Sequence, residues 1–160
     1  MRLDLTPLLG LREGEEPFEL EVPADRLLTS PGAFTFPKPL RFTGSVEKTP
    51  GKLVLRLRLE GVAQAPCDRC LRMVEFPVAC QTEETLEESA AEGHFLDLTE
   101  PMAAALLAQL PMKVLCREDC KGLCPVCGKD LNTGACNCRT GELDPRFDDL
   151  RAFFKLDQEV

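Results

Sequence analysis

Residues 53–82, LVLRLRLEGVAQAPCDRCLRMVEFPVACQT, contain two alternating apolar and polar patterns separated by a close pair of cysteines. In the first pattern leucine occupies every second position, and most of the positions between carry arginine or glutamate. Strict alternation is typical of a strand with one buried face. The stretch therefore predicts strands over residues 53–64 and 72–82, joined by a turn that exposes Cys67 and Cys70.

Segments nearer the N-terminus extend the same pattern. Residues 18–22 and 40–47 alternate in the same way, and Thr49-Pro50-Gly51 has the composition of a tight turn. Two alternating runs around such a turn are typical of an antiparallel hairpin. We therefore expect a small antiparallel β body within residues 1–112.

Helical signals follow the strands. Residues 100–110 are predicted to form a helix, with Thr99 as its N-cap and Pro101 in its first turn, where the missing N–H costs nothing. Its buried stripe should consist of Ala103, Leu106, Leu107 and Leu110. A second helix is predicted to begin at Asp144-Pro145. The expected fold class is α+β, with a small antiparallel β body, a packed helix, a zinc-stapled cysteine-rich tail and a C-terminal helix.

Charge is unevenly distributed along the chain. There are 27 acidic and 19 basic residues, a formal net charge of −8, which argues against binding nucleic acid over the whole surface. Residues 81–100 contain seven acidic side chains and no lysine or arginine. We expect this segment to be a solvated, mobile connector, with a docking strip for a basic partner as the alternative.

Eight of the nine cysteines form four close pairs. In chain order these are Cys67 and Cys70, Cys116 and Cys120, Cys124 and Cys127, and Cys136 and Cys138. A tetrahedral zinc site needs four soft ligands, and a short loop can present two sulfurs to one ion. Because the chain shows neither a signal peptide nor a membrane-spanning apolar run, we expect a cytoplasmic protein whose thiols stay reduced. Four pairs therefore predict two zinc sites rather than disulfides.

The third and fourth pairs can close a site locally. Residues 124–128, Cys-Pro-Val-Cys-Gly, are typical of a knuckle whose backbone N–H groups donate to the sulfurs. The first and second pairs are each other's natural partners, which would staple the strand turn to the tail. A rival arrangement combines one cysteine of the second pair with the third pair, and iron–sulfur ligation uses the same four thiolates. The ninth cysteine, Cys80, is interpreted as a small buried hydrophobe.

Catalysis is not predicted. A redox Cys-x-x-Cys motif normally opens a helix after a strand, whereas the first cysteine pair lies between antiparallel strands. His94 is the only histidine and is interpreted as solvent-facing rather than as a general base. Trp and Tyr are absent, so the aromatic platform of single-strand binders is missing. We expect a non-enzymatic protein, with an iron–sulfur or redox protein as an alternative.

Three stretches carry a resemblance to a known family: CDRCLRMVEFPV (67–78), LLAQLPMKVLCREDCKGLCPVCGKDLNTGACNC (106–138) and LDPRFDDL (143–150). They are similar to the bacterial YceD family, whose members are described as large ribosomal RNA subunit accumulation proteins. The resemblance implies a cytosolic, non-enzymatic factor that supports accumulation or processing of large-subunit (23S) ribosomal RNA. It also supports a zinc site shared by the first and second cysteine pairs.

Mechanistically, we expect a zinc-stabilised adaptor that binds RNA or ribosomal protein. Zinc would fix loops that cannot otherwise hold a shape. We expect ribosomal RNA, a pre-ribosomal particle or basic ribosomal proteins as partners, with no membrane and no small-molecule substrate. The alternative is a protein-binding zinc module that affects RNA only indirectly. Residues 113–160 should pack with the body as one unit. The candidate RNA contacts are the basic side chains near the cysteines: Arg69, Arg72, Lys113, Arg117, Lys121, Lys129 and Arg139.

Overall fold

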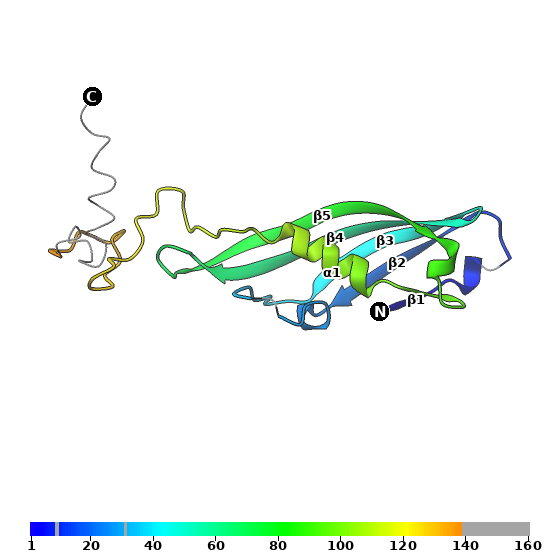
Figure 1. The fold of residues 1–160 in the computed structure, drawn as a ribbon, viewed down its shortest axis with the longest axis horizontal. Helices are drawn as coiled ribbons and strands as arrows, with labels where there is room; N and C mark the ends of the chain where they lie inside the picture. The colour runs from blue at the N-terminus through cyan, green and yellow to red at the C-terminus, as the bar shows by residue number, and fades with distance from the viewer. Residues whose placement is uncertain (9, 31, 139–160) are drawn as a thin grey trace, which may run out of the picture.

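The structure is a computed structural model that describes residues 1–8, 10–30 and 32–138 of the chain. Within these residues the chain forms two antiparallel sheets and one α-helix, which confirms the expected α+β class (Figure 1). Short 3-10 turns occur at Thr6–Leu8, Ala24–Arg26 and Glu88–Ala90. The strands and the helix are β1 (Arg2–Asp4), β2 (Gly14–Val22), β3 (Leu40–Thr49), β4 (Lys52–Pro66), β5 (Met73–Glu87), β6 (Phe95–Asp97) and α1 (Thr99–Gln109).

The main sheet is a four-stranded antiparallel meander in the order β2-β3-β4-β5. The predicted hairpin around Pro50-Gly51 is confirmed, because Thr49 pairs with Lys52 across that turn. The long strands β4 and β5 are paired over their whole length, from Lys52 opposite Glu87 to Pro66 opposite Met73. The β4–β5 ribbon therefore carries the first cysteine pair at its tip, at the opposite end of the sheet from the β3–β4 turn (Figure 1).

The hydrophobic core lies on one face of this sheet. The alternate leucines of β4 point into it, and α1 packs across β4 and β5 with Leu98, Met102 and Leu106 fully buried. The opposite face is charged and carries ion pairs between neighbouring strands. Arg56 contacts carboxylates of β3 and β5 at 2.8 and 2.9 Å, and Arg41 pairs with Glu19 at 2.6 Å. Alternation along β4 thus separates an apolar inner face from a polar outer face.

The buried stripe of α1 differs from the predicted one. Leu107 is 56% exposed, and Ala103 and Leu110 are only partly buried. The residues that face the core are Met102, Ala105 and Leu106. The segment is apolar on nearly every side, so its pattern could not specify which face packs on the sheet. The prediction of Thr99 as N-cap is also wrong, because it is the Asp97 carboxylate that accepts the backbone N–H of Thr99, at 2.8 Å.

The acidic segment is not a mobile connector throughout. Strand β5 continues five residues beyond the predicted end at Thr82, so that Glu83 lies opposite Arg56 on β4. Sheet pairing with a long leucine-rich neighbour overrides the weak strand pattern of these residues. Strand β5 is also an edge of the sheet. Its glutamates and Pro77 are features that discourage pairing with another chain.

Two parts of the chain complete the description. Strands β1 and β6, which the sequence did not predict, pair with each other and connect the N-terminal residues to the segment before α1. The predicted C-terminal helix from Asp144 lies outside the described residues. Among the residues that are described, no helix is both long and apolar enough to cross a membrane.

Candidate metal centres

The turn between β4 and β5 positions the first cysteine pair. The backbone N–H of Cys67 donates to the carbonyl of Arg72 at 2.8 Å, and the N–H of Leu71 donates to the carbonyl of Cys67 at 2.9 Å. Leu71 has a φ of +60°, a left-handed conformation that favours glycine. The side chain of Leu71 is nevertheless large and 64% exposed.

The third cysteine pair occupies a turn with the same hydrogen bonds at the same spacing. The N–H of Cys124 donates to the carbonyl of Lys129, and the N–H of Gly128 donates to the carbonyl of Cys124, both at 2.9 Å. Gly128 has a φ of +73° at the position that Leu71 fills in the first turn. Both turns are therefore knuckles of one kind. The sequence indicated only the knuckle at Cys124 and Cys127, because glycine follows that pair, whereas leucine occupies the equivalent position after Cys70.

Backbone N–H groups in both knuckles point at sulfur. The N–H groups of Cys127 and Val126 lower the pKa of Cys124 to about 6. Burial raises the pKa of Cys67, but backbone N–H groups, that of Arg69 foremost, outweigh burial and lower it to about 6. Hydrogen bonds to a thiolate favour its charged form, which is the form that ligates metals.

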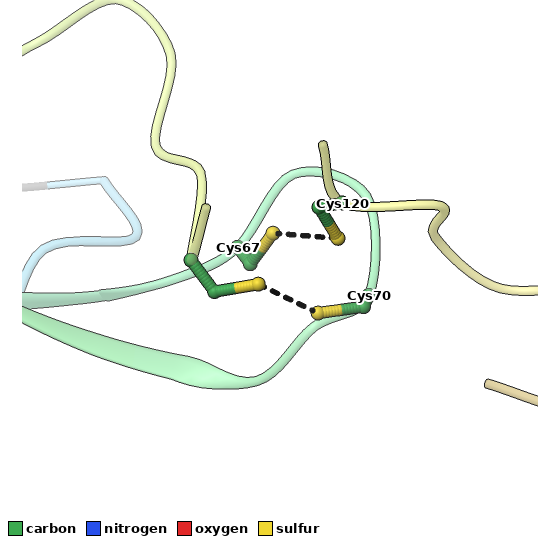
Figure 2. A group of neighbouring side chains, drawn as sticks. Cys67, Cys70 and Cys120 are labelled. Carbon is green, nitrogen blue, oxygen red and sulfur yellow. Dashed lines mark hydrogen bonds between the residues drawn. The ribbon is translucent and has the colours of Figure 1, made fainter. Parts of the chain in front are cut away.

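Cys116 and Cys120 approach the β4–β5 turn from the tail and complete the first group of four sulfurs. The Sγ atoms of Cys67 and Cys120 are 3.9 Å apart, and those of Cys70 and Cys116 are 3.6 Å apart. Figure 2 shows the labelled sulfurs of the turn and of Cys120 pointing toward one another. We call this group the hairpin site.

The spacing of the hairpin site suits a shared ion. All four sulfurs lie within 4.8 Å of one another. A tetrahedral ion with metal–sulfur bonds of about 2.3 Å places its sulfurs about 3.8 Å apart. A disulfide would require about 2.05 Å. The donor set and its geometry therefore fit a four-coordinate metal ion.

The remaining cysteines form a second group, which we call the tail site: Cys124, Cys127, Cys136 and Cys138. Their sulfurs also lie within 4.8 Å of one another. Cys127 is exposed, whereas the first knuckle cysteine of each site is buried. Among the described residues the rival grouping of tail cysteines does not occur. Both groups could hold metal ions. Cys80 belongs to neither and lies partly buried, 3.7 Å from the carbonyl oxygen of Ala105 in α1.

The two residues between Cys67 and Cys70 hold the tail against the hairpin. The Asp68 carboxylate accepts the N–H of Val114 at 2.7 Å, and the Asp68 N–H donates to the Val114 carbonyl at 2.8 Å. The carbonyl of Arg69 accepts the N–H of Leu123 at 3.0 Å. Gly122, with a φ of +75°, passes so close that a Cβ there would lie 2.9 Å from the Arg69 oxygen. Asp68 is a positioning residue that the sequence did not indicate.

Several of the predicted RNA contacts are engaged within the protein. The Arg69 guanidinium donates to the carbonyl of Cys120 at 2.7 Å. Arg117 donates to the side-chain oxygen of Asn132, and Lys129 donates to the carbonyl of Ala135, both at 2.8 Å. These three side chains therefore contribute to the shape of the tail.

The other predicted contacts are more accessible. Arg72 is 62% exposed and lies 3.4 Å from Asp130. Lys113 and Lys121 are exposed and form no ion pair with another residue in the described part of the chain. Arg139 lies outside the described residues.

Comparisons with known proteins agree with the resemblance in the motifs. A family model described as "Large ribosomal RNA subunit accumulation protein YceD" matches residues 55–154. An uncharacterized protein of Mycobacterium tuberculosis (strain H37Rv) is 31% identical over 122 residues, 59% of this chain and 58% of the relative. The chain thus matches less than two thirds of that relative's length. Uncharacterized protein YlbN of Bacillus subtilis is 25% identical over 133 residues, 76% of this chain and 77% of the relative. No solved structure matches the chain.

Proposed function

The chain belongs to the YceD family of large ribosomal RNA subunit accumulation proteins, and we propose that it is a non-enzymatic, cytoplasmic ribosome-biogenesis factor. In this role it binds large-subunit ribosomal RNA or a pre-ribosomal particle as an adaptor. The observation that carries the proposal is the pair of cysteine tetrads, which hold together loops bearing accessible basic side chains.

Zinc is the metal that we propose for both sites. Four thiolates at tetrahedral spacing are a donor set that zinc prefers in structural sites. Structural zinc supplies folding free energy to segments too short to build a core. Residues 113–138 form no helix and bury few apolar side chains, so the metal sites would supply much of their order.

Direct contact with RNA is proposed for Lys113, Lys121 and Arg72. These side chains extend from the zinc-stabilised loops and are accessible to a phosphate backbone. Both edge strands of the main sheet, β2 and β5, are rich in glutamate. Binding therefore concentrates at the cysteine-rich end, which is consistent with an acidic protein acting on RNA.

The RNA contact is testable by filter binding to large-subunit ribosomal RNA across a salt series. The double variant Lys113→Glu/Lys121→Glu should bind more weakly, and its slope of log affinity against log salt should fall by about 1 for each phosphate that the lysines no longer neutralise. The matched control is Lys38→Glu/Lys52→Glu, which makes the same charge change on exposed lysines of the β body.

The outcomes separate two classes of adaptor. Equal weakening by both double variants would mean that only net charge matters, against a defined basic surface. If the unaltered protein shows no affinity for the ribosomal RNA even at low salt, direct RNA contact is refuted. In that case the protein-binding module, tested by crosslinking to ribosomal proteins in pre-ribosomal particles, replaces it.

Metal analysis tests the sites themselves. Protein purified anaerobically should be colourless and contain two zinc ions for each chain, whereas an iron–sulfur cluster would be brown. Cys67→Ser should lower the metal content by one ion. Cys127→Ser should disorder the tail site while the β body stays folded. Unchanged metal content in Cys67→Ser would contradict the hairpin site.

A further inference from the structure

Asn132 connects the two tetrads. It lies in the loop between the two cysteine pairs of the tail site, yet its side-chain amide donates to the sulfur of Cys120 in the hairpin site at 3.5 Å. The same side chain accepts the backbone N–H of Lys121 at 2.8 Å. Asp130 fixes the orientation of the amide, because its carboxylate accepts hydrogen bonds from the backbone N–H of Asn132 at 2.8 Å and from the side-chain Nδ2 at 2.7 Å.

The position of Asn132 depends on the knuckle of the tail site. That knuckle is the turn of a small hairpin in which Leu123 pairs with Asp130, and the N–H of Leu131 donates to the carbonyl of Gly122 at 2.9 Å. Asn132 directly follows the returning arm of this hairpin. An ion in the tail site would close the knuckle and thereby hold the returning arm, with Asn132, against Cys120.

We propose that Asn132 couples the two metal sites, so that filling the tail site increases the affinity of the hairpin site for zinc. This inference rests on the proposed binding of zinc at both sites. An N–H group that donates to a ligating sulfur neutralises part of its charge and fixes its direction. Coupling between binding sites is reciprocal, so filling the hairpin site must strengthen the tail site by the same factor.

The size of the effect follows from the role of such outer contacts. Loss of a hydrogen-bonding partner of a metal ligand typically lowers metal affinity about 10–100-fold. Cys120 is almost fully buried, so water has little access to replace the missing donor. We therefore expect removal of the Asn132 amide to raise the zinc dissociation constant of the hairpin site by about tenfold or more.

Asn132→Asp keeps the shape and the accepting oxygen of the side chain but removes the N–H that faces Cys120, together with the N–H that the Asp130 carboxylate accepts. Asn137→Asp is the matched control: it adds the same charge to an exposed asparagine of the tail site segment. Asn132→Ala removes the donor without adding charge. It tests the role of the amide in zinc binding even if the aspartate variant misfolds. Zinc affinity of the full chain is measured by competition with a chelator.

A double-mutant cycle with Cys127→Ser isolates the coupling. In the unaltered background, loss of the tail site should weaken the hairpin site by at least about fivefold. In the Asn132→Ala background the same loss should have little further effect, because the connection is already broken. Effects that simply multiply, or an Asn132→Asp variant that behaves like Asn137→Asp, would overturn the coupling. A single zinc ion in the unaltered chain would instead overturn the proposed zinc sites themselves and the coupling with them.

A spectroscopic measurement separates sulfur contact from general loosening of the tail. In the full chain loaded with Co²⁺ in place of zinc, Asn132→Ala should shift part of the thiolate-to-cobalt absorption to lower energy. The reason is that a thiolate without its N–H donor is a stronger electron donor. An unshifted spectrum would exclude the contact between Asn132 and the ligating sulfur.

Discussion

Arg69→Met should loosen the tail from the hairpin, although the sequence alone predicts Arg69 as an RNA contact. Methionine keeps a long flexible stem but removes the guanidinium that donates to the carbonyl of Cys120 at 2.7 Å and, more weakly, to that of Glu118 at 3.3 Å. Because Cys120 belongs to the hairpin site, a tail that docks less well should bind the metal less well. Arg72→Met is the matched control in the same turn.

The magnitude follows from these contacts. A hydrogen bond from a charged donor contributes about 1.5–3 kcal/mol, and only the shorter contact is given full weight. Since the Arg69 side chain is accessible to water, we take the lower end, about 1.5 kcal/mol, which corresponds to about a tenfold change in an equilibrium constant. Arg72 makes a 3.4 Å ion pair at 62% exposure. Such a pair contributes about 0.5 kcal/mol or less, a factor of about two.

The assay is zinc affinity by chelator competition, run beside RNA binding for both variants. We expect the hairpin site of Arg69→Met to bind zinc about tenfold more weakly, and that of Arg72→Met about twofold more weakly or less. Equal zinc affinities in the two variants would refute the conclusion that Arg69 holds the tail against the hairpin. A loss of RNA binding by Arg69→Met without any change in zinc affinity would restore the interpretation from the sequence.

Three further predictions concern the body. Leu106→Ala should destabilise the protein by about 2–5 kcal/mol in chemical denaturation, whereas Leu107→Ala should change stability by about 0.5 kcal/mol or less, and the reverse order would mean that the helix phase is wrong. Gly44→Ala should cost about 2–3 kcal/mol, because its Cβ would lie 2.0 Å from a carbonyl oxygen of β4; an unchanged melting temperature would contradict that packing. The N-terminal ammonium, then Thr99, hold the pKa of Asp97 below its usual range. Its contribution is therefore present above pH about 4 and is lost as pH falls further, so the melting temperatures of Asp97→Asn and the unaltered protein should converge in acid.

The strands were predictable because their signal is local. Alternation in residues 53–82 arises because every second side chain of a strand faces the core. This holds for any half-buried strand, whatever its neighbours in the sheet. The extension of β5 was not predictable from its own residues, because the pairing with β4 decides it. The phase of α1 was ambiguous for a related reason: an almost wholly apolar helix packs on whichever face fits the sheet.

The grouping of the cysteines was likewise predictable where it is local and not where it depends on tertiary contacts. Spacing within each pair determined by itself that short turns present two sulfurs together, and the glycine after Cys127 marked one knuckle. Only the tertiary structure decided that Cys116 and Cys120 reach Cys67 and Cys70. Helix α1 packs along β4 and β5, and the chain that leaves it runs toward the tip of the β4–β5 ribbon (Figure 1).

The contacts that secure this meeting were equally hidden in the sequence. The carboxylate of Asp68, the guanidinium of Arg69 and the amide of Asn132 act on backbone and sulfur atoms distant along the chain. Local patterns carry no information about such partners, because the partners become neighbours only in the folded chain. The sequence therefore determined which residues could bind a metal and that the third and fourth pairs could close a site locally, and only the tertiary structure brought the second cysteine pair to the first.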